Sequence, residues 1–245
     1  MIRLAGWASV AGAMLAAAPA RAQDYRSVGV EVTSDEVRRG LSWSEGRASA
    51  SADVALSRGV LEASARIAAI RESARHGGAG AVADLAAGGS WDLGAFRLRA
   101  EGIAHLFAGA RPDMDYVELA ASGSYSIGPA RLMAGAVYAP AQRTIGGSNL
   151  YLHADADAGI PGTPLTLLAG IGHSTGGVSD PLRAQRLRPG GAYTDWRVGV
   201  EHRSGMLTLG VHYLGTDVAR GRAFGPFADA GHAGDRLVGR ARLAF

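Results

Sequence analysis

The sequence predicts an all-β protein: a transmembrane antiparallel β-barrel of about twelve strands with up-and-down topology. Segments of about ten residues alternate between apolar and polar side chains, as in a sheet that has lipid on one face and water on the other. Short turns and longer connections follow these segments in strict alternation. Beyond residue 22 the chain has no uninterrupted apolar run of about 18 residues, so the strands, not helices, are expected to cross the membrane.

The last predicted strand, 236–245, shows the alternation most clearly. One row holds only uncharged residues: Leu237, Gly239, Ala241, Leu243 and Phe245. The other row carries three arginines: Arg236, Val238, Arg240, Arg242 and Ala244. A strand places these rows on opposite faces, whereas a helix would mix them. The pattern resembles the closing strand of a bacterial outer-membrane barrel, which implies that Phe245 is an assembly signal for the barrel assembly machinery.

The first 22 residues have the features of a secretory signal peptide. Arg3 precedes an apolar run from Leu4 to Ala20, and Ala20-Arg21-Ala22 matches the small-x-small cleavage pattern. We therefore expect a cleaved signal peptide over 1–22 and an outer-membrane barrel over 23–245, with no second domain.

The predicted strands are delimited by their alternation and by the turn residues between them. They cover 25–34, 47–57, 60–71, 80–91, 96–105, 116–127, 130–138, 150–160, 165–172, 193–203, 206–214 and 236–245. Connections after even-numbered segments are tight turns, and those after odd-numbered segments are longer, as outer-membrane barrels require. Four aromatic residues fall near the ends of the outer rows, where an aromatic girdle is expected: Trp91, Tyr125, Tyr138 and Tyr213.

Composition and charge narrow the functional classes. The chain has no cysteine, so a disulfide framework and a thiolate metal site are excluded. Its net charge of +3 includes Arg3 and Arg21, so 25 basic residues minus these two leave 23 against 22 acidic ones in the expected mature chain. This near balance gives no basis for a nucleic-acid partner. The sequence indicates no cofactor and no metal.

A family resemblance lies between the first two predicted strands. Residues 32–48, Val-Thr-Ser-Asp-Glu-Val-Arg-Arg-Gly-Leu-Ser-Trp-Ser-Glu-Gly-Arg-Ala, are similar to the N-terminal signature of the TorF-type putative porins. The matching positions are Ser34, Asp35, Arg39, Gly40, Ser42, Ser44, Gly46 and Ala48. Glu36 stands where the family has tyrosine, and Arg47 where it has proline. The resemblance implies an outer-membrane barrel of putative porin type, without an established substrate or catalytic residue.

This signature has two interpretations. In the first it stabilises a hairpin, with Arg39 paired to Asp35 and Gly40 bending the chain. In the second it is a loop that folds toward the pore mouth, where Arg38, Arg39 and Trp43 would contact solute.

The inner rows carry the candidate pore-lining residues. These are Arg66, Arg97, Arg99, Glu101, Glu118, Arg131, Asp155, Asp157, Arg197, Arg236, Arg240 and Arg242. Because arginines and acids are nearly equal in number, a cross-strand lattice of ion pairs is one expectation. The alternative is a constriction whose unpaired arginines attract anions.

The most concrete function for this pattern is a narrow channel for passive diffusion of small polar solutes across the bacterial outer membrane. A closed structural or adhesive barrel that acts through its external loops is an alternative, as is a barrel enzyme of phospholipase type. His173 and Ser174 point to opposite faces of a strand and cannot form one dyad, so we expect no catalytic residues. The expected partners are outer-membrane lipid and lipopolysaccharide, the barrel assembly machinery and small solutes.

Overall fold

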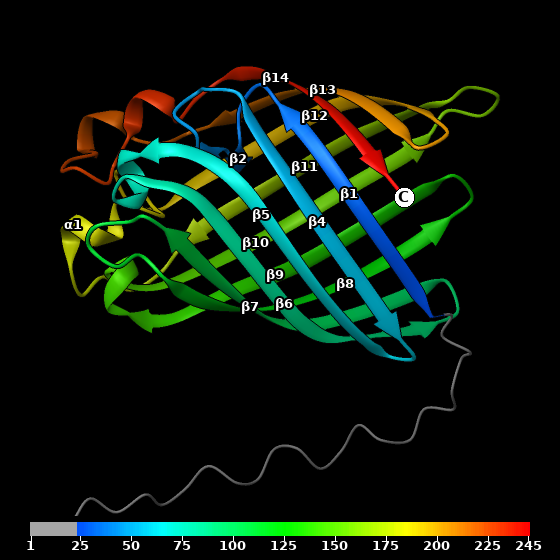
Figure 1. The fold of residues 1–245 in the computed structure, drawn as a ribbon, viewed down its shortest axis with the longest axis horizontal. Coiled ribbons are helices and arrows are strands. Elements are labelled where there is room, and N and C mark those ends of the chain that lie inside the picture. Colours follow the sequence, from blue (N-terminus) through cyan, green and yellow to red (C-terminus); the bar gives the residue numbers. More distant parts are fainter. Residues whose placement is uncertain (1–23) are drawn as a thin grey trace, which may run out of the picture.

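The computed structural model describes residues 24–245, and the predicted signal peptide 1–22 lies outside them. The described chain forms a closed barrel in which twelve strands pair antiparallel in chain order (Figure 1). The first strand closes the barrel by pairing with the second and with the last. The predicted fold class and strand number are confirmed.

The barrel strands and the smaller elements have the following bounds. The barrel consists of β1 (Tyr25–Thr33), β4 (Ser49–Arg58), β5 (Leu61–Ser73), β6 (Ala79–Leu93), β7 (Phe96–Ala108), β8 (Tyr116–Ile127), β9 (Ala130–Gln142), β10 (Gly147–Gly159), β11 (Leu165–Thr175), β12 (Tyr193–Ser204), β13 (Leu207–Thr216) and β14 (Arg236–Ala244). The connections contain β2 (Val37–Arg38), β3 (Leu41–Ser42), α1 (Pro181–Ala184) and the 3₁₀ turns η1 (Ala74–His76), η2 (Arg143–Ile145), η3 (Arg220–Arg222) and η4 (Ala230–His232). In the described part of the chain, no helix is long and apolar enough to cross a membrane.

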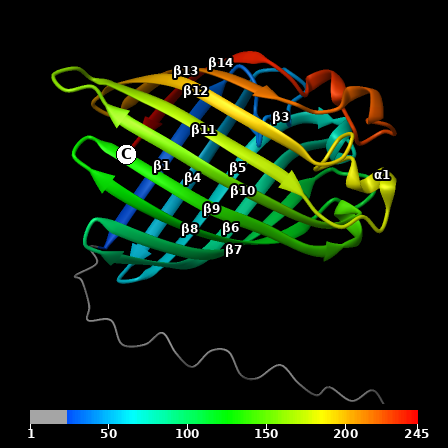
Figure 2. The ribbon, with the colours of Figure 1, turned by 180° about the vertical axis from the view of Figure 1, so that it is seen from behind.

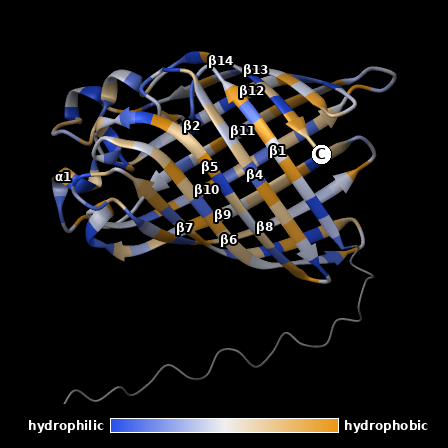
Figure 3. Ribbon diagram, viewed as in Figure 1, coloured by the Kyte–Doolittle hydropathy of each residue, from blue (hydrophilic) through white to orange (hydrophobic). Residues whose placement is uncertain are grey.

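The pairing register of the strands places polar and apolar side chains on opposite faces of the sheet, as the sequence alternation predicts. Asp53 on β4 lies beside Arg66 on β5, and Arg66 lies beside Asp84 on β6, all on the inner row. Thr208 and Leu209 on β13 pair with Arg242 and Ala241, so threonine faces inward and leucine outward. Figure 3 shows the resulting alternation of hydrophobic and hydrophilic bands along the strands.

The connections divide the barrel into two unlike ends. Tight turns join β4 to β5, β6 to β7, β8 to β9, β10 to β11 and β12 to β13 at what we call the turn end. The six other connections gather at the opposite end, the long-loop end, together with α1 (Figure 2). Several strands extend past their predicted bounds toward this end; β9 reaches Gln142 rather than residue 138.

Aromatic side chains mark the edges of the apolar band. At the turn end, the rings of Phe96 and Tyr125 lie 4.5 Å apart on the outer face, and Trp91 is exposed nearby. Tyr138 and Tyr213 are exposed on the outer face toward the other end. This distribution fits the predicted girdle at the two interfaces of a membrane.

The inner rows are buried at the long-loop end and solvated at the turn end. A buried apolar cluster fills the lumen beneath the long loops: Trp43, Ala68, Ile70, Ala79, Val82, Phe107, Met114, Tyr116, Ala139, Ile145 and Leu187. At the turn end, by contrast, the side chains of Arg97 and Arg131 are 58% and 55% exposed. The lumen is therefore a water-filled vestibule that opens at the turn end and leads to a packed long-loop end.

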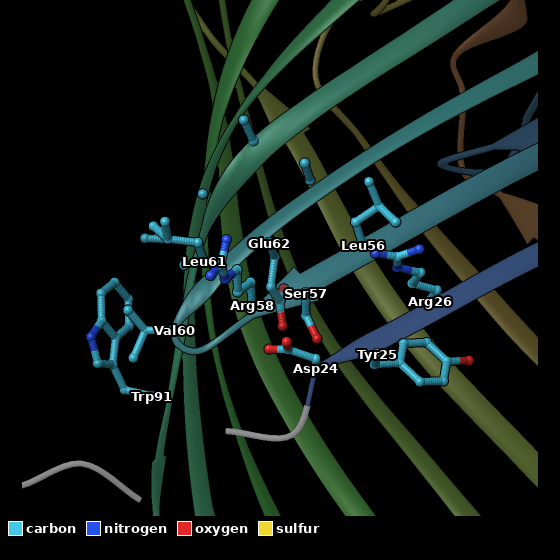
Figure 4. A pocket seen from close by; sticks show the side chains of 15 residues that line it. Asp24, Tyr25, Arg26, Leu56, Ser57, Arg58, Val60, Leu61, Glu62 and Trp91 are labelled. Atoms are coloured by element: carbon cyan, nitrogen blue, oxygen red, sulfur yellow. The ribbon is translucent and has the colours of Figure 1, made fainter. Parts of the chain in front are cut away.

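A hollow of about 890 Å³ at the turn end belongs to the outer surface. In Figure 4, Val60, Leu61 and Trp91 lie on one side of the wall, whereas Ser57 and Glu62 lie on the other. Its lining is mostly apolar and comes largely from outer-row residues that would face lipid, so we place the candidate site inside the barrel.

The two faces of β13 give a direct test of the register. Replacing Leu209 with arginine should cost about 2 to 4 kcal/mol of unfolding free energy, because the charge meets hydrocarbon near the midplane. Thr208→Arg should cost much less, because its side chain enters the solvated lumen. Urea unfolding in lipid vesicles measures both, and equal costs would contradict the register.

Candidate functional site: an inserted loop beneath a two-arginine clasp

Residues 34–48, which connect β1 to β4, fold into the lumen as a small hairpin of β2 and β3 (Figure 1). We call this segment the inserted loop. Its turn needs Gly40, whose φ is 71° and which lies against β12 and β13. A Cβ there would approach Thr216 Cγ2 to 2.4 Å and Asp195 Cβ to 2.7 Å. Glycine therefore permits both the left-handed conformation and the close contact with β12 and β13.

Two ion pairs fasten one side of the inserted loop to neighbouring strands. The two terminal guanidinium nitrogens of Arg66 on β5, Nη1 and Nη2, donate to the carboxylate of Glu36 at 2.8 and 2.9 Å. Arg38 donates to both carboxylate oxygens of Asp84 on β6, at 3.0 and 2.7 Å, and stacks over the ring of Trp43. Bidentate pairs of this kind fix geometry as well as adding charge-assisted hydrogen bonds.

Arg39 reaches a different part of the wall. It donates to Glu118 on β8 at 2.6 Å and lies over the ring of Tyr151 on β10. The hydroxyl of Tyr193 on β12 donates to the carbonyl of Arg39 at 2.8 Å. These contacts of Arg39, together with the ion pairs of Glu36 to β5 and of Arg38 to β6, make the inserted loop span the lumen.

Asp35 holds the base of the inserted loop. Its carboxylate accepts hydrogen bonds from the hydroxyls of Ser42 and Ser44, at 2.6 and 2.9 Å. It also accepts a bond from Arg236 on β14 at 2.8 Å. The predicted pairing of Arg39 with Asp35 is therefore wrong: the positive φ of Arg39, 50°, and the turn at Gly40 carry its side chain across the lumen to Glu118.

Trp43 does not contact solute, in contrast to the second interpretation of the signature. It is only 4% exposed and packs in the apolar cluster, with its ring 4.2 Å from that of His76. Arg38 and Arg39 remain about one-fifth exposed, which is the only solvent access that these three candidates have.

Arg75 ties three connections together above the inserted loop. Its side chain is completely buried and donates to the carbonyls of Ser42, Arg186 and Asp229, at 3.3, 2.9 and 2.8 Å. Arg75 itself belongs to the connection between β5 and β6, so four of the long connections meet at one side chain.

Arg186 ties in the remaining connections. It is also completely buried, and it donates to His76 Nδ1 at 3.0 Å and to the carbonyls of Met114 and Thr144 at 2.6 and 3.2 Å. Its guanidinium lies over the ring of Phe107. We call Arg75, His76 and Arg186 the outer clasp, because their contacts include all six long connections.

The outer clasp holds positive charge without a close carboxylate. The nearest carboxylate oxygen, from Asp229, is 3.9 Å from Arg75, and no ion pair forms to Arg186 among the described residues. Burial lowers the pKa of Arg186 to about 10, so this side chain stays protonated at neutral pH, and burial also lowers the pKa of Arg75. Backbone carbonyls and His76 accept hydrogen bonds from every guanidinium nitrogen of the two arginines except Nη2 of Arg186, which is buried without a partner among the described residues. Such charge-assisted bonds are typically worth about 1.5 to 3 kcal/mol each.

All twelve candidate pore-lining residues lie on the inner row: Arg66, Arg97, Arg99, Glu101, Glu118, Arg131, Asp155, Asp157, Arg197, Arg236, Arg240 and Arg242. Three of them, Arg66, Glu118 and Arg236, bind the inserted loop. The others pair with one another or with other acids along the wall below it.

The wall below the inserted loop is the expected lattice of ion pairs. Arg242 donates to Asp53 at 2.6 Å across β1, and Arg197 donates to Asp155 at 2.7 Å across β11. Arg240 lies 2.7 Å from Glu201, Arg131 lies 2.8 Å from Asp157, and Arg99 lies 2.9 Å from both Glu62 and Glu101. Every arginine of β14 thus has an acidic partner.

A cavity of about 400 Å³ lies where the vestibule meets the inserted loop. Charged side chains of the loop, including Asp35, Glu36 and Arg38, line it together with inner-row residues such as Arg197 and Arg240. A polar solute that enters from the turn end would meet this charged surface.

Other sequence candidates are not brought together. His173 faces outward and bonds to Thr194, whereas Ser174 is completely buried on the inner row. Asp155 and Asp157 each bind an arginine, and within residues 24–245 no group of three or more His, Asp or Glu is arranged to hold a metal.

Sequence reasoning missed the outer clasp. Arg75, His76 and Arg186 lie in connections, outside any period-two pattern, and Arg186 is 111 and 110 positions from its two neighbours Arg75 and His76. Their burial is the feature that distinguishes them, and no local signal predicts it.

Gly40→Ala should loosen the inserted loop, because the added methyl group overpacks against Thr216 and Asp195 at a cost of about 1 to 3 kcal/mol. Trypsin cleavage after Arg39 should accelerate by about tenfold or more, since each 1.4 kcal/mol is a factor of ten. Gly59→Ala is the matched control, because Gly59 has φ 63° but no atom within 4 Å of the added methyl. Equal acceleration in both variants would show that contact with the wall does not hold the loop.

Solved structures with a similar fold are membrane barrels of low sequence identity. The KdgM porin superposes with a TM-score of 0.58 at 6% identity, covering 89% of this chain and 99% of its own. A structure described as "Unveiling the Mechanism Behind the in-meso Crystallization of Membrane Proteins" gives 0.55 at 13% identity, covering 90% and 83%. LpxR from Salmonella typhimurium gives 0.44 at 11%, covering 89% and 99%, which is too distant to carry an argument. These similarities support the fold alone, that of an outer-membrane barrel.

No curated protein sequence matches the chain. A family model described as "Bacterial protein of unknown function (Gcw_chp)" matches residues 17–234, which is most of its length. The chain therefore belongs to the Gcw_chp family of bacterial proteins, and its fold is an outer-membrane β-barrel.

Proposed function

We propose that this protein is an outer-membrane channel for the passive diffusion of small polar solutes, with the inserted loop as its gate. The observation that carries the proposal is the way the loop is held. It meets the wall through salt bridges to β5, β6, β8 and β14, directly above a solvated, charged vestibule. In each pair the guanidinium group stays partly exposed to the vestibule although most of the carboxylates are buried, so water can reach the freed cations. The loop can then detach while the barrel stays intact, at the cost of these charge-assisted bonds.

The orientation follows from the connections. Outer-membrane barrels have short periplasmic turns and long external loops. The vestibule then opens to the periplasm, and the outer clasp faces the outside of the cell. The resemblance of residues 32–48 to the TorF-type putative porins supports a porin of this kind, because the matching positions build the inserted loop.

The wall chemistry supports weak ion selectivity. The arginines and acids of the vestibule neutralise one another in pairs, so neither sign of charge dominates its surface. A small polar solute would pass without strong attraction or repulsion. We propose no enzymatic role, because the His173 and Ser174 candidates face opposite sides of β11.

A closed structural barrel is the second candidate, and the buried apolar cluster favours it. That cluster joins the inserted loop to the long connections through Trp43 and Leu187. A channel requires these contacts to open, whereas a barrel that acts through its external loops does not.

Planar-bilayer recording distinguishes the two. The wild-type protein should show low conductance with infrequent openings. Arg38→Gln together with Arg39→Gln removes charge-assisted bonds worth about 1.5 to 3 kcal/mol each and should raise the open probability by about tenfold or more.

Arg97→Gln together with Arg131→Gln is the matched control, because it removes the same charge from inner-row pairs at the turn end. It should leave the open probability unchanged. Absence of conductance in all three proteins would favour the closed barrel. Equal effects of the two double variants on the open probability would show that the inserted loop is not the gate.

A further inference from the structure

His76 is the one group of the outer clasp whose ordinary pKa, about 6.5, lies near the physiological range. It is completely buried, its Nδ1 accepts the Nε–H of Arg186, and its Nε2 has no hydrogen-bond partner. An imidazole that accepts at Nδ1 carries no proton there, so the closed arrangement requires neutral His76.

The surroundings of His76 oppose a positive charge. Its ring lies between those of Trp43 and Phe107, at 4.2 and 4.8 Å. The ionisable groups with the largest effect on its pKa are Arg186 from the connection between β11 and β12, Arg75 beside it on η1, Arg38 on β2 and His105 on β7, and each of them lowers it. Burial, followed by these cationic neighbours, lowers the pKa of His76 well below its ordinary value.

We propose that the outer clasp is an acid-sensitive switch: protonation of His76 Nδ1 removes the acceptor of Arg186 and releases the long connections from the end of the barrel. A proton on Nδ1 would face the Nε–H of Arg186 at the present distance of 3.0 Å. Arg186 also binds the carbonyls of Met114 and Thr144, so its displacement loosens two further connections. This inference deepens the proposed function and rests on it for the link between opening and conduction.

The direction of the pH effect follows from proton linkage. When the clasp opens, water reaches His76 and its pKa returns to about 6.5, the ordinary value. Below that pH His76 binds a proton in the open state but not in the closed state. The ratio of closed to open molecules should be constant above about pH 6.5 and should fall by about tenfold for each unit below it, until the pKa of the closed state is reached.

Trp43 gives a readout that does not depend on conduction, because it packs against His76. In a chain whose Trp7, Trp91 and Trp196 are replaced by phenylalanine, emission from Trp43 should shift reversibly to the red between pH 7.5 and pH 5. The asparagine of a His76→Asn variant keeps an acceptor near the position of Nδ1 but cannot be protonated in this pH range. Emission from Trp43 in this variant should therefore equal that of the His76-containing chain at pH 7.5 and should stay constant on acidification. His173→Asn, an exposed control, should keep the full shift.

An unchanged emission of Trp43 in the His76-containing chain would overturn the switch, whether or not the asparagine variant folds. An equal shift in the His76→Asn chain would also overturn it and would assign the acid response to the carboxylates that hold the inserted loop. An emission shift that depends on His76, without any conductance at pH 5, would support the acid-sensitive switch and would contradict the proposed channel function.

Discussion

The closed end of this barrel depends on the hydrogen bonds of Arg75 and Arg186 to backbone carbonyls of the long connections. Irregular segments packed over a lumen bury carbonyl groups that no strand ladder can satisfy, and each one left unpaired is costly. A guanidinium group has five N–H donors in a fixed plane, so one side chain can serve several carbonyls at once. Two arginines thereby fasten all six long connections and allow an apolar cluster to form beneath them.

The barrel thus combines two kinds of interior in one sheet. Toward the long-loop end the inner rows are buried and pack against the inserted loop as in a globular core, with bonded polar groups such as His105 and Glu118 among the apolar ones. Toward the turn end the same rows carry paired charges that stay partly exposed. The ion pairs of Glu36, Arg38 and Arg39 lie at the boundary, where a solvated charge network meets a dry core. The proposed protonation of His76 would act on this boundary, because His76 packs against Trp43 of the inserted loop.

The wall could be predicted from the sequence because its information is local. Period-two alternation separates the two faces of each strand, so the rows of Leu243 and Arg242 were predicted correctly, and the turn residues fix the strand order. The site could be predicted only in part. The signature residues Asp35, Arg39 and Gly40 do form a hairpin, but Arg39 pairs with Glu118, 79 positions away, and Trp43 is buried. Contacts made by a loop after it folds back into the lumen leave no periodic trace in the sequence.

The central claim is that the inserted loop and the outer clasp close one end of the barrel while the other end stays open. Measuring access to the lumen from each end tests it most directly. The chain has no cysteine, so a single cysteine at Ser124, on the inner row of β8, can report access without background. Near neutral pH, a membrane-impermeant maleimide should label it rapidly once the periplasm is opened and at least about tenfold more slowly from outside intact cells, given the bonds that hold the clasp. Equal labelling from both sides would contradict an external end closed by the inserted loop and the outer clasp.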